Sequence, residues 1–499
     1  MGRGNGMHSA IAELPLVIIR RDGDVPMHCQ LSAAMRGAIL RGELAPGTRL
    51  PSTRALSLEL GVSRNTVIAA YDQLYAEGFT EAQRGRGTRV VSPLPEVVLR
   101  LHRVSAPLPS GDVRAPAGPG GSTGGWLATH DPDGPLAFSV GVPALDQFPF
   151  TLWSRLAGRR LRQGARELFD YGDLAGYPPL RTAIAEYLGI ARGIGCRPEQ
   201  VMVTLGAQQA LDLAARLILR SGDSVLIEDP SYPGVRDVLD NLGVELIPVP
   251  VDGEGMRIQD GDRTRPARMA YVTPSHQFPL GVTMSLERRM ELLEWARSAD
   301  AWIVEDDYDS AYCYGGRPLP ALHALDTSGR VLYIGTFSTV LFPGLRIGYV
   351  IVPAALAQEF PGMRPSLGGS PPHVLQAALC DFVRAGHFAQ HVRRMRGLYV
   401  ERRSSLLNAL ARYLGEVVQV VHTNTGMHLA GFLPEPLDDA CIAAEARRHG
   451  VSVLPLKPLY IGPAARPGLV MGFAAADRDA ITAGVQTLAA VIESMGKGL

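Results

Sequence analysis

The chain has 499 residues, of which 46% are hydrophobic and 20% are charged, and its formal net charge is zero. This length suits about two or three domains, and the balanced charge excludes an overall attraction to nucleic acid or acidic membranes, so any such attraction must be local. The five cysteines are scattered, which indicates neither disulfides nor a zinc site. No apolar run approaches a membrane span and no secretory signal is indicated. We therefore expect a cytoplasmic protein without a metal.

Composition divides the chain into four segments. Residues 93–135 are rich in Pro, Gly and small polar groups and lack apolar periodicity, which indicates a linker. From residue 136 onward, helix-length amphipathic stretches alternate with short apolar runs such as "VLYIGT", which is typical of an α/β domain with a mainly parallel sheet. We predict a tail over residues 1–25, a DNA-binding domain over 26–92, the linker over 93–135 and an α/β domain over 136–499.

Three helices and a hairpin are predicted in the DNA-binding domain. Ser52 and Ser63 are expected to cap the second and third helices, and Gly61 to end the second. The spacing of apolar residues predicts one buried stripe on each helix. The residues expected to be buried are Leu31, Met35 and Ile39 on the first helix, Ala55, Leu56 and Leu60 on the second, and Val67, Ala70, Tyr71 and Leu74 on the third.

The second and third helices have the pattern of a helix-turn-helix, in which the start of the third helix meets base edges. Arg64 and Asn65 suit guanine and adenine edges. The hairpin "GFTEAQRGRGTRVV" concentrates arginines at its tip, where they suit phosphate contacts, although arginines in such a turn could simply be solvated. The candidate DNA-binding residues are Arg54, Ser63, Arg64, Asn65, Thr66, Arg84 and Arg86, with Arg89 in the same hairpin.

The segment "LPSTRALSLELGVSRNTVIAAYDQLYAEGF", followed by "RGRGT", resembles the winged helix-turn-helix domain of GntR-type bacterial transcription regulators. The resemblance covers some 65 residues. It implies that the partner of this domain is a double-stranded DNA operator.

Several segments of the larger domain together indicate a site for pyridoxal 5′-phosphate (PLP). In "TLGAQQALDL", Gly206 and Ala207 stand at a strand-to-helix turn that suits a phosphate, although a plain α/β turn explains it equally well. Tyr232 in "EDPSYPG" could stack on a pyridine ring. The strand "WIVEDDYDS" ends in acids, one of which could pair with a pyridinium nitrogen. In "GTFSTVLFPGLRIGY", the groups suited to a phosphate are Thr336, Ser338 and Arg346.

These segments, with "YGDLAGYPPLRTAIAEYL" and "YVTPSHQFPLGVTMSLERR", resemble the MocR subfamily of GntR regulators, in which a winged helix precedes a fold-type I aminotransferase-like domain. The resemblance implies a homodimer whose regulatory domain senses PLP, alone or with an amino compound. The positions it implies are Asp306 at the pyridine nitrogen, Tyr308 at the ring hydroxyl, Tyr232 near the ring face, phosphate contacts from Gly206, Ala207, Ser338 and Arg346, and Tyr171 near the partner's phosphate pocket.

The chain departs from the family pattern at two positions. Thr339 stands where the family has the lysine that forms the Schiff base, and a threonine hydroxyl can neither form this bond nor shuttle the proton of transamination. Val470 in "LVMGFA" stands where the family often has the arginine that binds the substrate carboxylate. We therefore expect a regulator that holds PLP, or a ligand derived from it, only noncovalently, and that is not a transaminase.

Three alternatives remain open from the sequence. The first is an active PLP-dependent aminotransferase with an appended DNA-binding domain, in which Lys457 supplies the amine. The second is a chain in which a natural lysine at position 339 was replaced, although Val470 favours a natural loss because it is an independent change at the same site. The third is an empty, purely structural domain.

Overall fold

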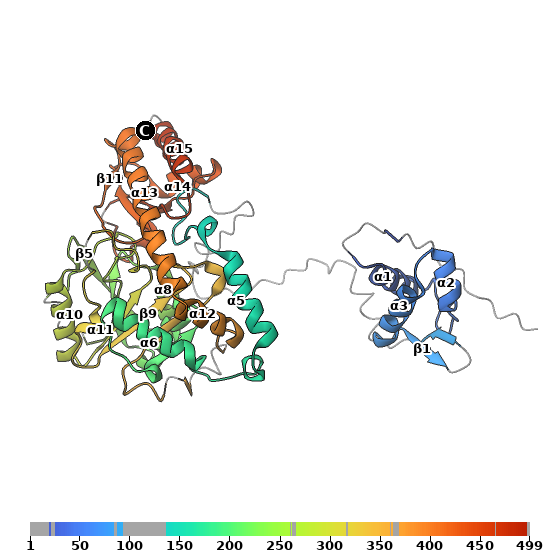
Figure 1. The fold of residues 1–499 in the computed structure, drawn as a ribbon. Coiled ribbons are helices and arrows are strands. Elements are labelled where there is room, and N and C mark those ends of the chain that lie inside the picture. The colour runs from blue at the N-terminus through green and yellow to red at the C-terminus, as the bar shows by residue number, and fades with distance from the viewer. Residues whose placement is uncertain are drawn as a thin grey trace, which may run out of the picture. The chain divides into compact units, whose positions relative to one another are not determined.

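The computed structural model describes residues 19–20, 25–83, 87–92, 136–259, 261, 266–315, 318–359, 361–362, 369–464 and 466–496. The chain divides into two compact units, residues 1–118 and 119–499, each of which is described below by itself (Figure 1). Nearly all of the predicted tail and the whole of the predicted linker lie outside the described residues. Within the described part, no helix is both long and apolar enough to cross a membrane.

The first unit is a winged helix, with three helices and a two-stranded antiparallel hairpin. Ser52 accepts a hydrogen bond from the backbone N–H of Ala55, and Ser63 accepts one from that of Thr66, each at 3.1 Å, so both predicted caps are confirmed. Gly61 ends the second helix with a φ of 64°, as predicted. The elements are α1 (Met27–Leu40), α2 (Thr53–Leu60), α3 (Arg64–Ala76), β1 (Thr80–Gln83) and β2 (Gly87–Val90).

The core of this unit contains the predicted stripes of α1 and α3, all of whose members are buried. The prediction for α2 was correct for Leu56, which is fully buried, but wrong for Ala55, which is exposed. Consecutive helical residues point about 100° apart, and this short helix contacts the core chiefly through Leu56. Its neighbour Ala55 therefore faces away, while Leu60, one turn further on, is half-buried.

The second unit is built on an eight-stranded sheet in the order β3-β10-β9-β8-β7-β4-β5-β6. The five strands from β9 to β5 run parallel, whereas β10 and β6 run antiparallel to their neighbours, so the prediction of a mainly parallel sheet is confirmed. The strands are β3 (Val201–Thr204), β4 (Ser224–Asp229), β5 (Glu245–Asp252), β6 (Gly255–Met256), β7 (Ala267–Val272), β8 (Trp302–Asp307), β9 (Val331–Thr336) and β10 (Gly348–Ile351).

Helices cover both faces of this sheet. Successive residues of a strand point to opposite faces, so apolar residues on both faces must be covered. In β8, Val304 packs in one cluster with α7 and α8, and Ile303 packs in another with α10. The helices of the unit are α5 (Phe150–Gln163), α6 (Pro178–Arg192), α7 (Ala207–Ile218), α8 (Pro233–Leu242), α10 (Leu286–Ser298), α11 (Leu322–Leu325), α12 (His373–Arg384), α13 (His387–Leu414), α14 (Asp439–Arg448) and α15 (Arg478–Gly496). Short 3-10 helices are η2 (Leu145–Gln147), η3 (Arg166–Phe169), η4 (Pro198–Gln200), η5 (Pro343–Leu345) and η7 (Lys457–Leu459).

A smaller antiparallel sheet forms the other end of this unit, beside α13, α14 and α15 (Figure 1). Its order is β11-β12-β14-β13, with bounds β11 (Gln419–Val420), β12 (His428–Phe432), β13 (Leu454–Pro455) and β14 (Gly468–Gly472). In the large sheet, β3, β9 and β8 end at the same edge. This edge is where open α/β sheets bind ligands, and the residues predicted to bind PLP cluster around it.

Candidate functional site

The start of α7 forms one end of the candidate cofactor site. Gly206 precedes the helix with a φ of 106°, which favours glycine. Gly348 of β10 packs so closely that a Cβ there would lie 2.8 Å from the Cα of Gly206. The guanidinium of Arg346 lies beside the same turn, since a Cβ at Gly206 would be 3.8 Å from its Cζ. The positive end of the α7 dipole and a cation therefore meet here, as an anion site requires.

Arg346 has two further features that suit a ligand contact. Its φ of 49° is in the left-handed region, which non-glycine residues adopt only where the surrounding structure imposes it. Its guanidinium is exposed and has no hydrogen bond or ion pair within the described part of the chain. The strained backbone of Arg346 places its guanidinium beside the start of α7. This combination indicates a functional position rather than a packing role.

Hydroxyl groups of the loop after β9 adjoin this end of the site. Register places Thr336 opposite Gly348, and the backbone of Phe337 is bonded to that of Ile347 next to Arg346. The Thr336 hydroxyl accepts a hydrogen bond from the backbone N–H of Ser338 at 3.1 Å. The Ser338 hydroxyl is buried and has no partner among the described residues. A buried hydroxyl without a partner is costly, so this hydroxyl is a candidate for a ligand contact.

The three acids at the end of β8 have different surroundings. Glu305 accepts hydrogen bonds from the backbone at the start of α11, and Asp307 pairs with Arg192 at 3.0 Å and accepts a bond from Tyr333. Asp306 points to the other face of the sheet, where one carboxylate oxygen accepts a bond from Tyr271 at 2.8 Å. Glu305 is therefore fully bonded. Asp307 keeps one oxygen without a partner among the described residues, but its charge is balanced by Arg192. Asp306 has no ion pair in the described part of the chain and is the best placed of the three to pair with a cationic ligand.

Asp306 is suited to hold a protonated nitrogen. Its second carboxylate oxygen, Oδ1, is buried and has no hydrogen-bond partner in the described structure. Burial raises the pKa of Asp306 to about 7, and the nearby charges of Asp307 and Asp309 add to this effect. A pyridinium N–H would supply both the missing donor and the missing positive charge.

Aromatic side chains lie between these two ends. The rings of Tyr232 and Tyr308 each lie about edge-on to Phe278, with centroids 5.9 and 6.2 Å apart. The Tyr232 hydroxyl donates to Gln208, and that of Tyr308 donates to the backbone carbonyl of His276 at 2.9 Å. Tyr271 and Phe278 were not singled out from the sequence as site residues, because nothing in the sequence distinguishes them from other residues of an apolar strand and the loop after it.

Thr339 lies against the same cluster, and its hydroxyl donates to the backbone carbonyl of Tyr308 at 2.5 Å. Among the described residues the one lysine is Lys457, whose ammonium lies 3.9 Å from the Glu435 carboxylate, and Lys497 is outside the described residues. Val470 is fully buried in an apolar cluster with Phe278. Arg466 stacks on Phe432 and bonds Gln419, so its guanidinium is engaged elsewhere.

Tyr171 contributes nothing to this cluster within its own chain. Its side chain is 94% exposed, and the nearby apolar residues Phe169 and Leu174 are also exposed. Exposed large apolar side chains gathered in one segment are typical of an interface.

The candidate DNA-binding residues lie on or near the start of α3, except for those of the wing. Arg54, Arg64 and Asn65 are exposed, and Arg64 donates to the Thr53 hydroxyl at 3.2 Å. The hydroxyls of Ser63 and Thr66 are bonded to each other at 2.8 Å, so both already serve the helix cap.

The wing differs from the sequence-based interpretation in one arginine. Arg84 and Arg86 lie outside the described residues. Arg89 is half-buried and donates to the Gly47 carbonyl at 3.1 Å, so it stabilises the hairpin and is not a free contact at its tip. Arg49, which the sequence did not single out, is exposed and lies against Gly87 of the wing.

Comparison with known proteins agrees with both halves of this structure. The model of the bacterial regulatory proteins of the gntR family matches residues 29–90, and that of the class I and II aminotransferases matches residues 135–487. Over 477 residues the chain is 42% identical to the probable rhizopine catabolism regulatory protein MocR of Rhizobium meliloti, with 95% of each chain covered. It is 32% identical to the pyridoxine biosynthesis transcriptional regulator PdxR of Corynebacterium glutamicum, covering 94% of this chain and 97% of PdxR.

A solved structure shows the same fold in the larger unit. The α-aminoadipate aminotransferase LysN from Thermus thermophilus, complexed with N-(5′-phosphopyridoxyl)-L-leucine, superposes with a TM-score of 0.68 at 29% identity, covering 73% of this chain and 93% of LysN. The fold and the matches define a transcription regulator in which a winged helix precedes an aminotransferase domain of fold type I. The chain belongs to the MocR-like regulators of the GntR family.

Proposed function

We propose that this regulator binds PLP, or a ligand derived from it, noncovalently in its aminotransferase-like domain, that it does not catalyse transamination, and that ligand binding biases its contact with an operator. The observation that carries the proposal is a pair of buried, unpartnered polar atoms in one site. The Ser338 hydroxyl lies at the phosphate-suited end and Oδ1 of Asp306 at the other, with Thr339 in the same site.

The phosphate end fits a dianion. Backbone N–H groups at the start of α7, beginning with Ala207, and the guanidinium of Arg346 supply positive potential, and Thr336 and Ser338 supply hydroxyls. Gly206 keeps this turn free of a side chain beside the Arg346 guanidinium.

The ring end fits a pyridine. Asp306 would hold a proton on the ring nitrogen, Tyr308 would lie near the ring hydroxyl, and Tyr232 would flank the ring. Bound PLP supplies an electron sink for reactions of amines. This chain offers neither the amine that would attach the group covalently nor a base at position 339, since a threonine hydroxyl does not ionise near neutral pH. Binding therefore remains and turnover is lost.

The same domain is proposed to form the homodimer. Tyr171 is almost fully exposed beside other exposed apolar groups, and the family resemblance puts it near the partner's phosphate pocket. Two copies present two winged helices, which suits an operator with two half-sites. A ligand that binds one arrangement of the dimer more tightly than another shifts the population toward that arrangement.

The decisive experiment combines equilibrium dialysis with borohydride reduction. We expect the purified protein to bind PLP reversibly, to gain no mass on reduction, and to produce no keto acid from amino donors. Asp306→Asn and Ser338→Ala should each weaken PLP binding, whereas Asp479→Asn, an exposed aspartate on α15, should not. A stable mass gain on Lys457 after reduction, with transaminase turnover, would establish the active-enzyme alternative instead. Absence of any PLP binding would refute the cofactor assignment.

A further inference from the structure

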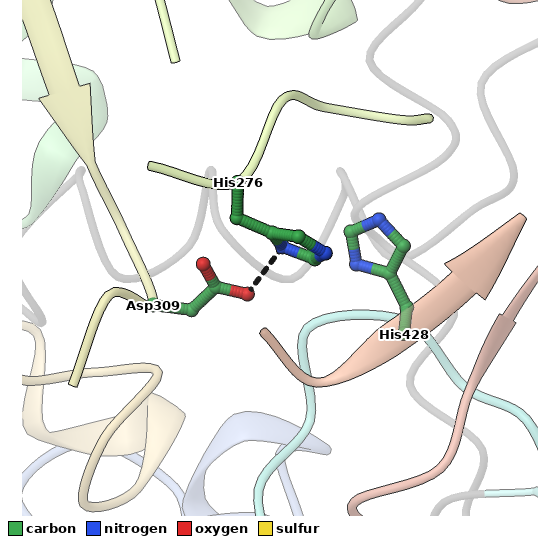
Figure 2. A group of neighbouring side chains, drawn as sticks. All are labelled: His276, Asp309 and His428. Atoms are coloured by element: carbon green, nitrogen blue, oxygen red, sulfur yellow. Dashed lines mark hydrogen bonds and ion pairs between the residues drawn. The ribbon is translucent and has the colours of Figure 1, made fainter. Parts of the chain in front are cut away.

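Three buried side chains form a second cluster next to the candidate cofactor site. His276 follows β7, Asp309 follows β8 and His428 begins β12 in the smaller sheet. Their side chains are at most 2% exposed, and one nitrogen or carboxylate oxygen from each lies within 4.8 Å of the others. Figure 2 shows His276 between the other two, with its ring beside that of His428.

The hydrogen bonds of this cluster determine where the ring protons lie. Nε2 of His428 lies 3.1 Å from the carbonyl oxygen of Pro279, which can only accept, so this nitrogen carries the proton and Nδ1 has a free lone pair. Nδ1 of His276 lies 2.9 Å from Asp309, and a carboxylate likewise accepts. The Tyr308 hydroxyl lies 3.0 Å from the same nitrogen but donates its proton to the backbone carbonyl of His276. The remaining nitrogen of His276, Nε2, then also has a free lone pair, and it has no partner in the described structure.

The two lone pairs face each other in a buried space. The ring centroids of His276 and His428 are 4.4 Å apart, and Figure 2 shows Nδ1 of His428 turned toward Nε2 of His276. Two acceptor atoms in contact without a donor repel each other, and burial removes the water that would screen them. A proton or a metal cation between them would remove this repulsion.

The surroundings hold His276 tightly in this orientation. A Cβ at Gly426 would lie 2.0 Å from its Cε1, and one at Gly281 would lie 3.0 Å from its Nε2. The ring therefore fits only because both neighbours are glycine. Asp309 also accepts a bond from the backbone N–H of Met427 at 3.2 Å, so the carboxylate behind the ring is held too.

We propose that Nε2 of His276 and Nδ1 of His428 bind a divalent transition-metal ion, with Asp309 orienting His276 and balancing the charge. A carboxylate bonded to the second nitrogen of a ligating histidine is a recurrent feature of zinc sites. Imidazole nitrogens favour Zn²⁺, Cu²⁺ or Ni²⁺ over Mg²⁺ or Ca²⁺. Metal–nitrogen bonds of about 2.0–2.1 Å require these side chains, whose ligand atoms lie within 4.8 Å of one another, to converge on one ion.

Such an ion would join the two sheets of the large unit. His276 and Asp309 belong to loops at the edge of the eight-stranded sheet, whereas His428 belongs to the four-stranded sheet. An ion that binds only when the three segments are assembled stabilises the folded state in proportion to its free concentration. The cluster would then act as a metal-dependent crosslink between the two sheets of the regulatory domain.

The test uses the full-length protein after removal of metals with a chelator. We expect Zn²⁺ to bind at one ion per chain in a competition assay against a chromophoric chelator, and to raise the temperature of thermal unfolding. Co²⁺ should give visible ligand-field bands of an ion bound to nitrogen at the same stoichiometry. If neither ion binds stoichiometrically, a proton rather than a metal lies between the rings and the proposal is wrong.

Variants locate the site. His428→Gln and His276→Gln should abolish the binding, and Asp309→Asn should weaken it by about 10–100-fold, as expected for loss of an orienting carboxylate. His422→Gln, an exposed histidine near the start of β12, is the matched control and should bind as the wild type does. If the buried histidine variants fail to fold, Asp309→Asn and the Co²⁺ spectrum decide. Unchanged Zn²⁺ affinity in the folded His428→Gln or Asp309→Asn protein would overturn the assignment.

Discussion

The hydroxyl of Thr339 donates a hydrogen bond to the backbone carbonyl of Tyr308, and this bond joins the loop after β9 to the loop after β8. The position predicted to bear a reactive lysine is thus occupied by a side chain with a packing role. The bond leaves Ser338, one position before Thr339, and Asp306, two positions before Tyr308, each with a polar atom that has no partner among the described residues. Loss of the amine and retention of the binding groups are separate properties, and they can be tested separately.

Replacing Thr339 by lysine tests whether the rest of the pocket is intact. We expect Thr339→Lys to take up PLP covalently, which gives an absorption band near the visible edge and a stable mass gain after borohydride reduction. Thr339→Val, which also removes the hydroxyl but adds no amine, is the control and should show neither signal. A colourless lysine variant would mean that the site has lost more than its lysine.

Recognition of the operator is expected to depend on the start of α3. Arg64→Ala and Asn65→Ala should each cost about 1–3 kcal/mol of discrimination between operator and unrelated DNA. Arg86→Ala should instead weaken binding to all sequences and reduce its salt dependence. Arg41→Ala, which removes an exposed arginine paired with Glu43 on the same unit, is the control. Binding titrations at several salt concentrations distinguish these effects, and equal losses on every DNA would contradict base readout.

The pH dependence of stability should report the environment of Asp306. Burial raises the pKa of this carboxyl from 3.8 to about 7, so between these values the folded state holds a proton that the unfolded state has released. The free energy of unfolding therefore falls as pH rises through this window, by at most about 1.4 kcal/mol per pH unit. Asp306→Asn abolishes this contribution.

Thermal unfolding of the ligand-free proteins checks this expectation. The variant should gain stability over the wild type, and the gain should be larger at pH 8 than at pH 5. Asp479→Asn, which changes an exposed carboxyl, should show no such difference. A gain that is equal at the two pH values would mean that Asp306 is already ionised in the folded domain.

Self-association should depend on the exposed aromatic surface around Tyr171. Tyr171→Asp combined with Phe169→Asp is expected to shift the protein from dimer to monomer in light scattering at micromolar concentration, because burying a charge at an interface is costly. Ile190→Asp alters a residue that is 90% exposed elsewhere, on α6, and should leave the dimer intact. A wild-type monomer that binds its operator with full affinity would refute the dimer model.

Much of the local structure could be predicted from the sequence. The caps at Ser52 and Ser63, the turn at Gly61 and the buried stripes of α1 and α3 depend on residues within one or two turns of each other, and these predictions are confirmed. The mainly parallel sheet also follows from the alternation of apolar runs and helical stretches. Such features can be read from the sequence because the spacing of apolar residues follows the repeat of a single helix or strand.

The tertiary structure alone decided which side chains meet. Strand alternation separates Asp306 from Glu305 and Asp307, but only the packing of α11 and of Arg192 shows that Glu305 is fully hydrogen-bonded and that Asp307 is held in an ion pair. Likewise, His276 and His428 are 152 positions apart in the sequence, and no spacing rule connects them. They meet because the loop after β7 lies against the start of β12, and a contact between two sheets depends on the whole fold rather than on any local pattern.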